Sequence, residues 1–119
     1  MMDDFPSELG QFTGTEKYYF NPLYRWMQYT DGVKHFAQHA GGGAYWFLDI
    51  VGTEMRSVMD KGEDFLCIDL VVADESAKIL VTDGNDKKLW SRNINYTDCP
   101  AGSYKFFLVG GVLMLASEY

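Results

Sequence analysis

Two histidines and an aspartate have a spacing that could hold a metal ion. His35 and His39 are the only histidines in the chain, and Asp31 precedes His35 by one helical turn. On a helix these positions share one face, and imidazole and carboxylate groups are zinc ligands. The zincin pattern needs Glu directly after the first histidine, where this chain has Phe36. The shared face also lies opposite the apolar side of the expected helix, so exposed polar surface is the simpler interpretation. We predict no metal and no cofactor.

Acidic side chains are the next candidates for chemistry. Asp49 and Glu54 flank the apolar side of an expected helix, and Asp69 interrupts an expected strand. Acid–base catalysis needs a partner group within hydrogen-bond reach, and the spacing places no His, Lys or Ser beside these carboxylates. The glycine run 41–43 lacks the Lys-Ser/Thr of a P-loop and the spacing of a dinucleotide fingerprint. We therefore predict that the protein is not an enzyme.

The chain has two cysteines, which favour two free thiols over a disulfide. Cys67 lies in an apolar run and reads as a small buried hydrophobe, and Cys99 stands before Pro100. Neither has a basic neighbour or a helix start that would activate the thiol. The number of cysteines permits one bond, so the sequence leaves their pairing open.

Aromatic residues gather between positions 18 and 29. Tyrosine and tryptophan are enriched at binding hot spots because they combine large area with a polar group, although most of this cluster is expected to be core or half-core. The predicted interaction residues are Tyr18, Tyr19, Tyr24, Trp26 and Tyr29 for contact area, and Asp31, Asp49, Glu54, Asp83 and Asp86 for electrostatic steering.

The charge of the chain narrows the classes of partner. Ten basic and seventeen acidic side chains give a formal net charge of −7. Affinity for nucleic acid comes mainly from Lys and Arg contacts to phosphate, so direct nucleic-acid binding is disfavoured and a basic protein partner is favoured. No segment reaches the roughly 20 apolar residues that cross a bilayer. The start of the chain is acidic where a secretory signal is basic, so we expect a cytoplasmic protein without membrane contact.

Periodicity predicts two helices followed by a meander of strands. Apolar residues recur at helical spacing over 31–40, after the N-cap signal Thr30, and again over 44–60. Period-two alternation begins at Phe65, with strong turn signals at 83–86 and at 110–111. We predict an α+β fold with two helices packed on an antiparallel meander of about four or five strands. Residues 1–10 are predicted to form a flexible arm, and 11–119 one domain.

Four short motifs carry a resemblance to a known family. They are the segments 12–16 (FTGTE), 29–33 (YTDGV), 44–46 (AYW) with Asp49, and 115–119 (LASEY). Over nearly its whole length the chain resembles an uncharacterised domain-of-unknown-function family of small bacterial, plasmid and phage proteins. Ala116 stands where the family pattern has Pro, and the run 41–43 is longer than usual. The resemblance implies a mobile-element accessory protein of the cytosol. From this context and the acidic charge we form the hypothesis that it blocks a host defence or nucleic-acid-handling protein, in the manner of an anti-CRISPR inhibitor.

The sequence therefore predicts a non-enzymatic, acidic protein-binding module. Two alternatives stay open. One is a metal- or small-ligand-binding protein or enzyme that uses Asp31, His35 and His39. The other is a homo-oligomeric structural protein, for example a homodimer, whose exposed aromatic side chains form the self-interface.

Overall fold

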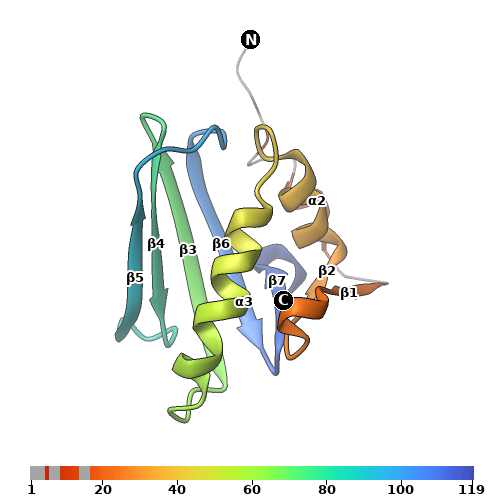
Figure 1. Ribbon diagram of the computed structural model, residues 1–119, viewed down its shortest axis with the longest axis vertical. Coiled ribbons are helices and arrows are strands. Elements are labelled where there is room, and N and C mark those ends of the chain that lie inside the picture. Colours follow the sequence, from red (N-terminus) through yellow and green to blue (C-terminus); the bar gives the residue numbers. More distant parts are fainter. Residues whose placement is uncertain (1–4, 6–8, 14–16) are drawn as a thin grey trace.

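The computed structural model describes residues 5, 9–13 and 17–119, and its main feature is a sheet of seven strands. Across the sheet the strands follow the order β1-β2-β7-β6-β3-β4-β5 (Figure 1). Their bounds are β1 Tyr18–Phe20, β2 Gln28–Thr30, β3 Phe65–Ala73, β4 Ser76–Thr82, β5 Lys88–Ile94, β6 Gly102–Val109 and β7 Val112–Leu115.

The sheet is larger than predicted and is not an antiparallel meander. The expected α+β class is confirmed, but β2 pairs with β7 in parallel, with Gln28 opposite Val112 and Tyr29 opposite Leu113. The prediction rested on tight turns, which fix the direction only of strands that are neighbours in sequence. β2 instead runs directly into a helix, and the chain returns to it much later, when Gln28 N donates to Gly111 O at 2.8 Å.

Two helices cover one face of the sheet, as predicted (Figure 1). They are α2 (Asp31–His39) and α3 (Tyr45–Met59). The Thr30 hydroxyl caps α2 by accepting a hydrogen bond from Val33 N at 3.3 Å. Gly41 reverses the chain between the helices at a φ of +61°, and a Cβ there would lie 2.3 Å from Asp98 O. The glycine run therefore serves a tight connection.

The core lies between the two helices and the sheet. Three phenylalanines are fully buried there, Phe36 on α2, Phe47 on α3 and Phe106 on β6. Their ring centroids are 4.7 to 5.7 Å apart, which is the range of favourable aromatic pairs. The alternating residues of β3 that face the helices, from Leu66 to Val72, are buried as well.

The C-terminal 3₁₀ helix η3 (Ala116–Glu118) is tied to the start of α2. The Glu118 carboxylate accepts hydrogen bonds from Thr30 Oγ1 at 2.6 Å, Leu115 N at 3.0 Å and Gly32 N at 3.2 Å. Gly32 has no space for a side chain, because a Cβ would lie 2.6 Å from Glu118 Oε1. Two of the motifs that carried the resemblance, YTDGV and LASEY, thus meet in one structural contact.

The predicted flexible arm over 1–10 lies largely outside the described residues. Within it Phe5 and Leu9 are buried and belong to the hydrophobic core cluster. The motif residues 14–16 also lie outside the described residues. Both cysteines are free, which is the state that the sequence favoured while leaving their pairing open. Cys67 is buried, as predicted, and Cys99 is buried as well.

Candidate functional site

A cleft lies between α3 and the edge strand β5. Its volume is about 480 Å³, and its walls include Trp46 and Ile50 from α3 and Ile94, Tyr96 and Asp98 from β5 and the loop after it. Trp46 and Ile50 are one helical turn apart, so both side chains point to the same flank of α3. Tyr96 is 68% exposed, so most of its side chain is accessible to a partner.

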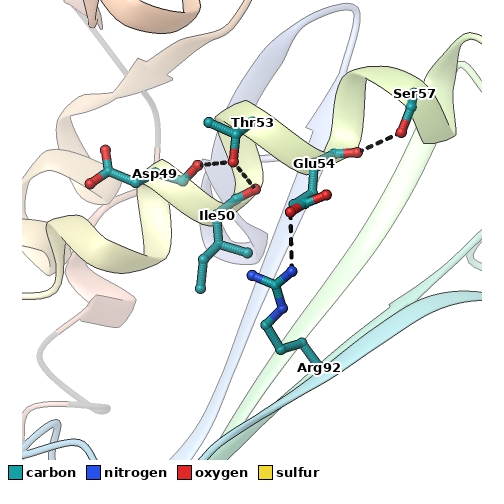
Figure 2. Close-up of polar contacts among 6 residues, drawn as sticks. All are labelled: Asp49, Ile50, Thr53, Glu54, Ser57 and Arg92. Atoms are coloured by element: carbon teal, nitrogen blue, oxygen red, sulfur yellow. Dashed lines mark hydrogen bonds and ion pairs between the residues drawn. The ribbon is translucent and has the colours of Figure 1, made fainter.

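An ion pair joins α3 to β5 further along the same flank. Glu54 Oε2 lies 3.0 Å from Arg92 Nη2, and the Arg92 guanidinium lies 5.1 Å from the centre of the Trp90 ring. Figure 2 shows Ile50 and Glu54 pointing from α3 toward the strand that carries Arg92, while Asp49 points away from them. Arg92 is the register partner of the buried Ile79, so its side chain lies on the helix side of the sheet.

Asp98, in the loop after β5, also lines the cleft. Its Oδ2 accepts a hydrogen bond from Gly42 N at 2.8 Å, which holds the connection between the helices against the loop after β5. The side chain is exposed, so one carboxylate stands at the rim of an otherwise apolar cleft.

β5 is an edge of the sheet and pairs, in the part of the chain described, only with β4. Edge strands present unpaired backbone N–H and C=O groups that can pair with an added strand. A bulge near Thr82 shifts the register at the start of β5, and the rest of the strand, from Trp90 to Ile94, pairs regularly. The cleft and the free edge are therefore adjacent.

Three of the predicted aromatic residues are structural. Tyr24 is buried, and its hydroxyl donates to Asp49 Oδ1 at 2.8 Å. Burial first, and this hydrogen bond next, raise the pKa of Tyr24 well above its ordinary value of 10.0. Trp26 Nε1 donates to Gly52 O at 2.8 Å, and Tyr29 is 8% exposed. These side chains hold residues 24–29 against α3 and the sheet.

The two remaining predicted aromatics lie on β1, at the opposite edge of the sheet from β5. Tyr18 is 53% exposed and is free to contact a partner. Tyr19 is half-buried, stacks on Tyr29 and carries the Lys34 ammonium 4.1 Å from its ring centre.

The structure does not bring the predicted carboxylates together. Asp31 begins α2, and Asp49 and Glu54 lie on different flanks of α3. Asp83 and Asp86 lie in the turn before β5, where Asp83 Oδ1 accepts from Asn85 N at 2.8 Å and shapes the turn. Of these carboxylates, Glu54 lies beside the cleft.

The predicted interaction residues did not include Trp46, Ile50, Ile94 or Tyr96, which line the cleft. Ile50 and Ile94 had the periodicity of core positions, and they do pack against the core as partly buried side chains. The available local signal was the Trp46–Ile50 spacing on α3, whereas the edge position of β5 depends on the order of the strands.

Of the two histidines, His35 contacts two aromatic side chains from the start of the chain, Phe5 and Phe12. His35 is half-buried rather than exposed, because Phe5 stacks on its ring at 6.0 Å and Phe12 lies 5.1 Å away. The His39 ring is exposed and 4.5 Å from that of His35. Among the described residues no three His, Cys, Asp or Glu side chains are placed to hold a metal ion together. In the same part of the chain no helix is long and apolar enough to span a membrane.

The fold and the cleft define a class of protein: a small α+β domain whose mixed sheet ends in an open edge beside a cleft formed with a helix. Within that class the chain belongs to a family of unknown function, DUF6876, whose sequence model matches residues 3–119. The predicted membership of an uncharacterised family is thus confirmed. No curated protein and no solved structure matches the chain.

Proposed function

We propose that this protein is a non-enzymatic binding module that receives an extended segment of another protein along β5. The observation that carries the proposal is the adjacency of a free strand edge, Lys88–Ile94, and an apolar cleft of about 480 Å³. In strand addition, backbone hydrogen bonds supply affinity, and pockets for alternate side chains supply specificity. Both elements are present on the same side of α3.

The side chains of the cleft suit the anchoring residues of such a segment. Alternate side chains of an added strand would point to the helix side of the sheet, since successive residues face opposite ways. There they would meet Trp46, Ile50 and Tyr96, and aromatic walls of this kind are typical of binding hot spots. An apolar residue in every second position of the partner segment is therefore expected.

Charge favours a basic partner. The net charge of −7 steers a positively charged protein toward this one, and the Asp98 carboxylate at the rim of the cleft offers a contact for Lys or Arg. Proteins that bind nucleic acid carry basic grooves, to which an acidic protein is attracted. Inhibition of a host nucleic-acid-handling or defence protein, by a cytoplasmic protein of mobile-element origin, is the specific role that we propose.

A random linear peptide library selected against the protein tests this proposal. We expect enriched peptides to alternate apolar residues and to carry Lys or Arg. Ile94→Glu places a charge in the cleft and should abolish their binding. Val71→Glu makes the same change on the opposite face of the sheet, at a side chain that is 46% exposed, and should leave binding intact. Peptides that bind the Ile94→Glu protein as well as the wild type would refute the proposed site.

A further inference from the structure

A second cleft lies on the opposite flank of α3 from the β5 cleft. It has a volume of about 500 Å³ and is formed by α3 together with the 3₁₀ helix η2 (Pro22–Tyr24) and the residues after it. Two arginines that are far apart in sequence, Arg25 and Arg56, line this one cleft. In Figure 1, β5 and the β1–β2 region lie on opposite sides of α3.

The walls of this arginine cleft are fixed by buried contacts. Gly52 lets the Tyr24 ring lie directly on α3, since a Cβ there would be 2.3 Å from Tyr24 Cδ1. The Trp26 indole donates to Gly52 O, and the Tyr24 hydroxyl donates to Asp49, each at 2.8 Å. The cleft is thus preformed, which lowers the entropic cost of binding.

The two arginines have no carboxylate partner among the described residues. Some other cations are paired within the fold, for example Arg92 with Glu54 and Lys105 with Asp69. The Arg25 guanidinium instead lies 5.5 Å from the centre of the Phe20 ring, and no ion pair between residues that the structure describes includes Arg56. In a chain with a net charge of −7, this cleft is lined by two arginines, and none of its lining residues is acidic.

Apolar surface adjoins that charge. Leu23, on the rim of the cleft, is 88% exposed, the most exposed large apolar side chain in the described part of the chain. The Tyr24 and Trp26 rings form part of the wall. A ligand that satisfies both features carries an anion next to an apolar group.

We propose that the arginine cleft binds an acidic peptide segment of a partner protein. A Glu or Asp carboxylate of that segment accepts hydrogen bonds from Arg25 and Arg56, and a neighbouring apolar side chain packs on Leu23. Arginine suits this role because its planar guanidinium binds a carboxylate through two parallel hydrogen bonds. The site is separate from the β5 cleft, so a test that refutes one of the two proposals does not refute the other.

Nuclear magnetic resonance titration with two short peptides tests the proposal. The probe alternates Glu with Leu, and the control peptide alternates Lys with Leu, at constant ionic strength. We expect the probe to shift the Arg56, Thr53 and Trp26 signals saturably at concentrations up to about 1 mM, and the control to leave them unchanged. An absence of shifts with the Glu-Leu probe would overturn the proposal. Equal shifts of these signals with inorganic phosphate alone would overturn the peptide assignment.

Two double variants separate the site from net charge. Arg25→Gln with Arg56→Gln should weaken probe binding by about tenfold or more, because two charge-assisted hydrogen-bond donors are lost. Lys78→Gln with Lys105→Gln removes the same charge from exposed positions on the face of the sheet opposite the helices, away from both clefts, and should leave affinity unchanged. Equal weakening in both variants would show a general charge effect and refute the site. Arg25→Lys with Arg56→Lys keeps the charge and should lie between them.

Discussion

Glu54 on α3 and Arg92 on β5 form a 3.0 Å ion pair that connects the helix layer to the edge strand beside the candidate cleft (Figure 2). Their side chains are 39% and 42% exposed, respectively, so water screens the attraction. The pair therefore sets the position of Arg92 over the Trp90 ring more than it stabilises the fold.

Removing the charge of Glu54 should leave stability almost unchanged. For Glu54→Gln we expect the free energy of unfolding to fall by less than about 1 kcal/mol, the range of exposed ion pairs. Urea unfolding monitored by tryptophan fluorescence measures this value. A loss of several kcal/mol would show that the pair is a major structural contact and contradict our reading of it.

Gly52 should not tolerate a side chain. Gly52→Ala would place a Cβ 2.3 Å from the buried Tyr24 ring, and the resulting shift should cost about 1–3 kcal/mol of stability. Thr53→Ala, at the next and exposed position of α3, is the matched control and should be nearly neutral. Thermal unfolding of the two variants compares them; equal melting temperatures would mean that Tyr24 does not pack on α3 as described.

Glu118 should stabilise the fold from the last turn of the chain. Glu118→Ala leaves Thr30 Oγ1, Gly32 N and Leu115 N without their acceptor, and we expect a loss of about 1–3 kcal/mol. Ser117→Ala removes only a 3.4 Å contact to Leu9 O and serves as the control. Similar unfolding midpoints for both variants would contradict the role assigned to the Glu118 carboxylate.

The burial of Tyr24, together with its hydrogen bond to Asp49, should make stability depend on pH in alkaline solution. Because the pKa of Tyr24 is raised in the folded protein, its contribution is complete below the ordinary value of 10.0 and is lost as the pH rises above it. Wild type should lose stability above about pH 10 more steeply than Tyr24→Phe. Tyr19, Tyr29 and Lys105, whose pKa values are also raised, are present in both proteins. Parallel curves of unfolding free energy against pH would exclude the predicted contact.

Local sequence patterns predicted the helices and turns well, but they did not predict the pairing of strands that are distant in sequence. The Thr30 cap, the apolar spacing of α2 and α3 and the Gly110–Gly111 turn are signals within a few residues, and each is confirmed. The parallel contact of β2 with β7 joins segments separated by two helices and four other strands, and no local signal reports it. The number of strands in the sheet was therefore underestimated.

The candidate site was hidden for the same reason. Trp46 and Ile94 line one cleft only because β5 lies at the sheet edge beside α3, which depends on the order of the strands. The aromatic residues at 18–29 drew attention through their number, but Tyr24 and Tyr29 are buried and Trp26 is hydrogen-bonded to α3. Composition reveals aromatic residues; the tertiary structure decides which of them reach the surface.

Hydrogen–deuterium exchange of the protein, with and without a peptide selected from the library, tests the central claim most directly. Strand addition pairs backbone groups at the free edge, so the amides of Lys88–Ile94 should exchange more slowly in the complex. The amides of β1, at the other edge, should not change. Protection confined to other elements, with unchanged exchange along β5, would contradict the account.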